Sequence, residues 1–166
     1  MTDRLVAFAA LVDSDADARP QVLEDFYRQW HEHPLLLDKW FSVQALAQRE
    51  ATLDEVERLL GHADFSLSNP NRVRALLGAL CQNLAVFHCP DGRAYRLLVD
   101  QIVKLDSSNP QLAAWLATPL TRWRRLEPAR RALLRGELEL LRSTDLSRDL
   151  YEIVSKSLPQ EDQSDG

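Results

Sequence analysis

The sequence is poor in the residues that mark several classes of protein. Its 166 residues include only two cysteines and five glycines, and Val, Ile and Thr together fill 17 positions. Two cysteines are too few for a disulfide framework, and five glycines do not suit a protein built from tight hairpins. No apolar run approaches the roughly 18 residues that a membrane-spanning helix needs. These scarcities argue against a disulfide-rich secreted protein, an all-β fold and a helical membrane protein.

The residues that are abundant favour helices. Leu occurs 30 times and Ala 18 times, and both lose little side-chain freedom in an α-helix. The length is close to that of one ordinary domain, and a chain of this size buries about 70% of its extended-chain surface without needing disulfides or metals. We therefore predict a single all-α domain over residues 1–158. Residues 159–166 hold no apolar side chain to bury and are predicted to form a mobile acidic tail.

The charge and the N-terminus bear on location and partners. A net charge of −5 opposes binding to duplex nucleic acid, because such binding depends on Lys and Arg replacing counterions on phosphates. The start Met-Thr-Asp-Arg lacks the basic flank and cleavage site of a secretory signal. We expect a reduced cytoplasmic protein, without nucleic-acid or membrane partners, in which Cys81 and Cys89 are free rather than bridged.

Prolines and capping residues divide the chain into short helices. The first helix is expected over residues 3–12, and a third over 35–48 that is apolar around most of its girth and should be central. Thr52 is expected to cap the next helix, with Glu55 completing a capping box. Prolines are expected to open or end other helices, and Ser147 to cap the last. The prolines in question are Pro20, Pro34, Pro70, Pro110, Pro119 and Pro128.

One helix start recurs. Ser-Asn-Pro stands at 68–70 and again at 108–110, forty residues apart, and each is followed by an amphipathic helix. Forty residues is the period of two-helix solenoid repeats. Long helices of about 20 residues, typical of four-helix bundles, are missing. The pattern favours a superhelical stack of paired short helices, a HEAT/ARM-like α-solenoid.

A search for catalytic chemistry finds little. The two histidines of His31-Glu32-His33 lie about 200° apart on a helix and cannot chelate one zinc ion together. The zinc-protease pattern H-E-x-x-H is missing, as are glycine-rich phosphate loops and the G-x-S-x-G pattern. His88 and Cys89 are adjacent, so their side chains point apart and suit nucleophilic catalysis poorly. We predict no catalytic residues and no metal ligands in this chain.

An arginine-rich segment is the stronger candidate for a surface that binds a partner. Six arginines lie between residues 122 and 135, interleaved with Trp123. The nearby glutamates favour a solvated, salt-bridged helix face over a nucleic-acid site. Trp30 and Trp40 sit among apolar neighbours and are expected in the core, whereas two other tryptophans are expected to be partly exposed. The candidate docking surface comprises Trp115, Trp123, Arg122 and Arg125.

A second candidate site follows Asn69-Pro70. Arg72 and Arg74 stand in the first turns of a helix, where cations oppose the helix dipole and need compensation. Two interpretations are open at this point. Either the arginines pair with acids such as Asp64 or Asp106, or they point into a functional cavity.

Several short motifs, taken in order, resemble the C-terminal domain of bacterial aminopeptidase N. Each is common alone, but their order and separations are specific, and the resemblance covers roughly residues 1–158. The motifs are Asp38-Lys39-Trp40-Phe41, Asn69-Pro70-Asn71-Arg72-Val73-Arg74, Phe87-His88 with Asp91-Gly92 and Tyr95, Asn109-Pro110-Gln111, Pro119-Leu120 and Leu146-Ser147-x-Asp149-Leu150-Tyr151.

The resemblance implies more than the composition does. The family's enzymes are cytoplasmic zinc aminopeptidases whose H-E-x-x-H helix lies in an earlier domain, so zinc and catalysis would belong there and this chain would need no cofactor. The chain would be the helical domain that caps the active-site cavity, with Asn71, Arg72 and Arg74 lining it. Its partners would be the catalytic domain and the peptides reaching the cavity. A second arginine that some relatives place after Asn-Pro-Gln is Trp115 here, which departs from a two-arginine clamp.

The sequence thus predicts a non-catalytic C-terminal domain that controls access to a zinc aminopeptidase. The alternative is a free-standing helical-repeat adaptor that binds a protein or peptide partner. An independent enzyme would need a metal or nucleophile that the chain does not display. A domain separated from its neighbours would expose a former interdomain face and could self-associate.

Overall fold

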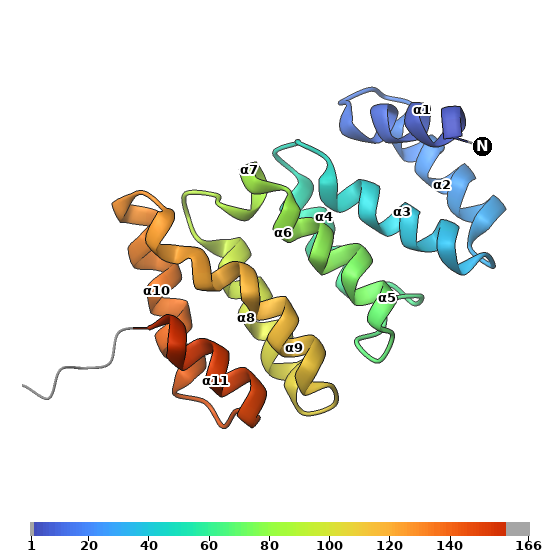
Figure 1. Ribbon diagram of the computed structural model, residues 1–166. Helices are drawn as coiled ribbons and strands as arrows, with labels where there is room; N and C mark the ends of the chain where they lie inside the picture. The colour runs from blue at the N-terminus through green and yellow to red at the C-terminus, as the bar shows by residue number, and fades with distance from the viewer. Residues whose placement is uncertain (1, 159–166) are drawn as a thin grey trace, which may run out of the picture. The chain divides into compact units, whose positions relative to one another are not determined.

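The computed structural model describes residues 2–158, and these residues form helices and no β-strand (Figure 1). The all-α prediction and the pairing of short helices are confirmed. The chain divides into two compact units, Met1–Phe87 and His88–Gly166. None of the helices in residues 2–158 combines the length and the apolar character that crossing a membrane requires. The predicted tail over 159–166 lies outside the described residues.

The first unit is built around α3. This helix packs against α1, α2, α4 and the segment from α5 to α6, as its apolar girth predicted. Trp40 is buried and its Nε1 donates to the Leu23 carbonyl at 3.0 Å, whereas Trp30 is only half-buried, so the core prediction holds for Trp40 and not for Trp30. The elements are α1 (Thr2–Asp13), α2 (Arg19–Trp30), α3 (Pro34–Leu46), α4 (Thr52–Leu60), α5 (Pro70–Val73), the π-helical turn η1 (Arg74–Gly78), α6 (Ala79–Gln82) and α7 (Leu84–Phe87).

A buried ion pair, and not a capping box, fixes the start of α4. The N-cap position is Ala51, and no side chain caps it. The Thr52 hydroxyl instead donates to the Ala47 carbonyl at 2.7 Å. The Glu55 carboxylate is drawn away from the backbone because it binds the guanidinium groups of Arg19 and Arg49. The predicted capping box is therefore wrong: Glu55 finds charged partners from outside its own helix.

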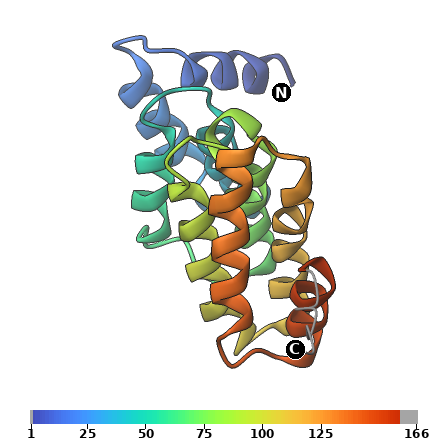
Figure 2. The same ribbon diagram turned by 90° about the vertical axis from the view of Figure 1, so that its left-hand side faces the viewer.

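The second unit begins at a left-handed glycine. Gly92 has φ of 70° and precedes α8, while the Asp91 carboxylate accepts the Arg93 N–H at 3.0 Å. Helix α8 packs against α9 and α10, and α11 packs against α9, α10 and η2; Figure 2 shows α10 lying along α8. The elements are α8 (Arg93–Asp106), α9 (Pro110–Ala117), the 3-10 segment η2 (Thr118–Arg125), α10 (Pro128–Arg142) and α11 (Arg148–Ser157).

Local capping signals account for most helix starts in this unit. The Asn109 side chain, within the recurring Ser-Asn-Pro start, accepts the Leu112 N–H. The Ser147 hydroxyl accepts the Leu150 N–H, which confirms the cap predicted there. The α-helix before Pro119 ends at Ala117 and continues as 3-10 helix. Glu127, whose capping role was not predicted, caps α10 through its carboxylate, and these backbone hydrogen bonds hold its pKa below the usual value.

Candidate functional site

The segment that starts at Asn69 carries the first candidate site. The Asn69 side chain accepts the N–H groups of Asn71 and Arg72, and Pro70 occupies the first turn of α5. The helix then widens into the π-helical turn at Arg74–Gly78, which continues into α6. Single π-turns inside α-helices are frequent at functional sites, because they change the direction in which neighbouring side chains point.

Arg72 points into the first unit. Its side chain is buried, with Nη1 3.2 Å from Asp38 Oδ1 and its guanidinium carbon 5.0 Å from the centre of the Phe41 ring. This combination of an ion pair and a cation–π contact compensates a cation near a helix start. Of the two interpretations, pairing with an acid is right for Arg72, but the acid is Asp38 and neither of the two acids suggested from the sequence. Asp64 accepts a hydrogen bond from Tyr27, and Asp106 accepts two from Ser147.

Asn71 and Arg74 are exposed and line an open depression of about 370 Å³. Its other walls come from α3 and include Asp38, Lys39 and Ser42. Lys39 and Arg74 make two cationic groups at one rim, and Asp38 is occupied by Arg72. The structure thus brings together two of the three predicted cavity residues, while Arg72 holds the wall from behind. Such a rim can attract a carboxylate or another anion.

The four residues of the candidate docking surface are not alike. Trp115 lies on α9 and is 45% exposed, and Arg122 and Arg125 are exposed on η2. Trp123 is only 5% exposed, and its indole Nε1 donates to the Ser157 carbonyl at 3.1 Å. The expectation of exposure therefore holds for Trp115 and is wrong for Trp123. Trp123 is buried against the last turn of α11, where the Ser157 carbonyl accepts its indole N–H.

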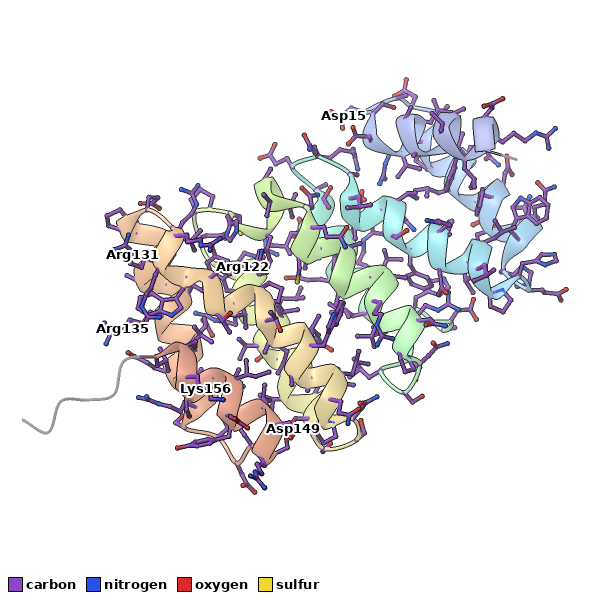
Figure 3. The ribbon with its side chains drawn as sticks, in the orientation of Figure 1. Asp15, Arg122, Arg131, Arg135, Asp149 and Lys156 are labelled. Carbon is purple, nitrogen blue, oxygen red and sulfur yellow. The ribbon has the colours of Figure 1, made fainter. Side chains whose placement is uncertain are left out.

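Ion pairs do lie along the arginine-rich face, as predicted. Arg130 pairs with Glu127 at 3.2 Å, and Arg135 pairs with Glu139 at 2.6 Å. Other arginines of this segment are exposed, among them Arg122 and Arg131, which Figure 3 labels together with Arg135.

A polar cluster near Gly92 was not anticipated. His88 Nδ1 lies 2.6 Å from the Tyr95 hydroxyl, and Arg130 Nε donates to the His88 carbonyl at 2.6 Å. Burial lowers the pKa of His88, and Arg130 lowers it further; burial raises the pKa of Tyr95 to about 12. The only sequence feature that relates the two side chains is their separation of seven residues, which does not by itself predict the contact. The cluster ties the start of α10 to the loop before α8, and this suits a structural role.

The remaining candidate groups do not converge. His31 packs on the Tyr27 ring and His33 on the Trp30 ring. Within residues 2–158 no group of three or more His, Cys, Asp or Glu side chains could hold a metal ion. Cys81 and Cys89 are both free, and burial raises the pKa of Cys81 to about 12. Zinc therefore has no ligand set in the described part of the chain.

Comparison with known proteins settles the family. One family model, described as a domain of unknown function (DUF3458_C) with ARM repeats, matches residues 1–159. The chain belongs to this family.

Its relatives place the family within longer proteins. The chain is 41% identical to aminopeptidase N of Escherichia coli and 40% identical to that of Caulobacter vibrioides, in each case over 95% of this chain and 18% of the relative. The crystal structure of Legionella pneumophila aminopeptidase A in complex with aspartic acid matches with a TM-score of 0.91 and 36% identity, again over 95% of this chain and 18% of that one. The chain thus spans less than a fifth of these relatives and corresponds to their C-terminal domain.

Proposed function

We propose that this chain is the non-catalytic C-terminal domain of a cytoplasmic zinc aminopeptidase and that it controls how peptides reach the active site. The observation that carries the proposal is the depression lined by Asn71, Lys39 and Arg74, backed by the ion pair between buried Arg72 and half-buried Asp38. Zinc and its ligands would lie in the catalytic part of the longer protein, which would be the main partner of this chain.

The different positions of the two arginines support the proposal. Arg72 is buried and contacts Asp38 and the face of the Phe41 ring. Arg74, two residues later, is exposed at the depression. A guanidinium held at a rim by a rigid wall can bind the terminal carboxylate of a peptide with two parallel hydrogen bonds. Asn71 adds an amide that can donate to a peptide carbonyl. These groups would orient a peptide and would not touch the bond that is cleaved.

A chimera tests the proposal. Residues 1–158 of this chain replace the C-terminal domain of the E. coli aminopeptidase N, and hydrolysis of alanyl peptides is compared with hydrolysis of an alanyl chromogenic amide. We expect an active chimera in which Arg74→Ala raises KM for peptides with a free carboxylate about tenfold, the equivalent of one charged hydrogen bond. The chromogenic amide, which lacks that carboxylate, should lose less.

The control is Lys104→Ala, which removes an exposed cation from α8, far along the chain from the depression. An equal loss of kcat for every substrate with Arg74→Ala would contradict a role in access. Turnover by the 166-residue chain alone would contradict the non-catalytic assignment. An inactive chimera, together with peptide binding by the chain alone, would favour the adaptor.

A further inference from the structure

A second depression, in the other unit, lies along the exposed face of α10. It measures about 310 Å³ and is separate from the rim that holds Arg74. Its lining includes Trp123, Arg131, Ala132, Arg135, Gly136 and Glu139. Gly136 has no heavy atom within 4 Å of the place its Cβ would occupy, so the groove is open above the middle of the helix. We call this surface the α10 groove.

The α10 groove and the segment around it carry an excess of positive charge: the lining holds Arg131 and Arg135 against Glu139. The guanidinium carbons of Arg124 and Arg135 lie 4.6 and 5.9 Å from the centre of the Trp123 ring. Residues 122–142 hold seven arginines and three glutamates, within a chain whose net charge is −5.

The carboxylates of this segment are already engaged. Glu127 caps α10 and pairs with Arg130, Glu137 pairs with Arg96, and Glu139 pairs with Arg135. Arg122, Arg124, Arg125 and Arg131 have no carboxylate within ion-pair distance in the part of the chain that the structure describes. An anionic occupant would therefore meet a surplus of positive charge.

An acidic segment of the chain begins next to the α10 groove. Trp123, in the wall of the groove, donates its indole N–H to the carbonyl of Ser157 at 3.1 Å, and Leu158 is buried beside it. Residues 159–166 follow directly and carry Glu161, Asp162 and Asp165 with no basic side chain. Figure 3 shows Arg131 and Arg135 on one side of α10.

Length permits the segment to reach the whole groove. Eight residues can span up to about 26 Å when extended. The exposed stripe of α10 from residue 128 to residue 139 is about 16 Å long at 1.5 Å per residue. A segment tethered this closely acts at an effective concentration in the millimolar range, so that even a weak interaction is populated.

We propose that the acidic segment 159–166 binds in the α10 groove, with its carboxylates on Arg131, Arg135 and Arg124. The bound segment neutralises the basic face of α10 and covers the edge of Trp123. Because the interaction is electrostatic and exposed, salt weakens it.

The test uses the 166-residue chain and a neutral-segment variant, Glu161→Gln/Asp162→Asn/Asp165→Asn, compared by amide and indole NMR at low and high salt. We expect shift differences at Trp123, Arg131, Arg135 and Gly136 that vanish at about 0.5 M salt, where the Debye length is only a few ångströms. An octapeptide with the sequence of residues 159–166 should bind the neutral-segment variant about tenfold more tightly than the native chain, because the native segment competes.

Two further variants separate the groove from general charge effects. Arg124→Gln/Arg131→Gln should remove the differences, whereas Lys104→Gln on α8 should leave them in place. Shift differences confined to the residues next to Leu158 would overturn the proposal. Equal peptide affinity for the native and neutral-segment chains would also overturn it and would point to a foreign acidic partner as the occupant.

Discussion

Arg19 and Glu55, 36 residues apart, form a two-pronged ion pair inside the first unit. Arg19 Nη1 lies 2.9 Å from Glu55 Oε1, Nη2 binds the second carboxylate oxygen, and Nε donates to the Val12 carbonyl at 2.7 Å. Both side chains are about 8% exposed. Arg19 thereby joins the end of α1, the start of α2 and the first turn of α4, and Arg49 adds a second cation to the same carboxylate.

Removing the carboxylate should therefore be costly. Glu55→Ala leaves two cations without their shared partner, and we expect the free energy of unfolding to fall by about 3–5 kcal/mol. The matched control is Glu24→Ala, whose exposed pair with Arg28 should cost less than about 0.5 kcal/mol. Urea denaturation followed by circular dichroism gives both values. A loss below about 1 kcal/mol for Glu55→Ala would show that the pair is dispensable.

Arg72 and Arg74 should differ in stability as they differ in position. Arg72→Ala leaves the half-buried Asp38 carboxylate without its cation and removes the guanidinium from the Phe41 ring, so we expect a loss of about 2 kcal/mol. Arg74→Ala changes an exposed residue and should stay within about 0.5 kcal/mol. Thermal melts of the two variants make the comparison, and equal destabilisation would place Arg74 in the core rather than at the rim.

The pH dependence of stability should carry a contribution from His88. Burial, with Arg130 nearby, lowers the pKa of His88 in the folded chain below its unfolded value of about 6.5. The unfolded chain therefore binds the proton more readily, and the stabilisation is complete above pH 6.5 and is lost as the pH falls through the folded pKa. We expect His88→Gln to flatten the change in unfolding free energy between pH 7.5 and 5.

His31→Gln provides the matched control for that measurement, because it makes the same substitution at an exposed histidine. Carboxylates titrate in all three proteins, so only the difference between profiles reports on His88. Parallel profiles for native chain and His88→Gln would contradict the buried, neutral imidazole.

Two glycines offer opposite outcomes for the same substitution. Gly92 has φ of 70°, and a Cβ there would lie 3.3 Å from the Leu133 side chain, so Gly92→Ala should destabilise by about 1–2 kcal/mol. Gly136 lies inside α10 with open space around it, so Gly136→Ala should stabilise by about 0.5–1 kcal/mol. Chemical denaturation of the pair gives the sign directly. Stabilisation by Gly92→Ala would contradict the left-handed turn.

The features that the sequence predicted well are local ones. Asn69, Asn109 and Ser147 cap helices within three residues of themselves, so the signal and the contact lie in the same short segment. The features that it missed depend on distant partners. Glu55 leaves its expected cap for Arg19, and Trp123 is buried because the Ser157 carbonyl lies beside it in space.

The candidate site divides in the same way. Asn71, Arg72 and Arg74 were found through a short motif, but the motif does not tell which arginine faces inward. Arg72 faces inward because it pairs with Asp38, which lies on a different helix, α3. Pairing across helices depends on how the helices pack, and this packing cannot be predicted from the residue spacing within either segment.

The π-helical turn at Arg74–Gly78 limits which length changes the domain tolerates. One residue more than a regular turn rotates everything beyond it by about 100° relative to what precedes it. Shortening this stretch by a single residue would keep a helix, but it would rotate the residues after the turn relative to Arg74 at the depression. Leu80, which is fully buried, would then face different neighbours. An alignment gap at this turn would thus mark homologues in which this depression is lined by other side chains.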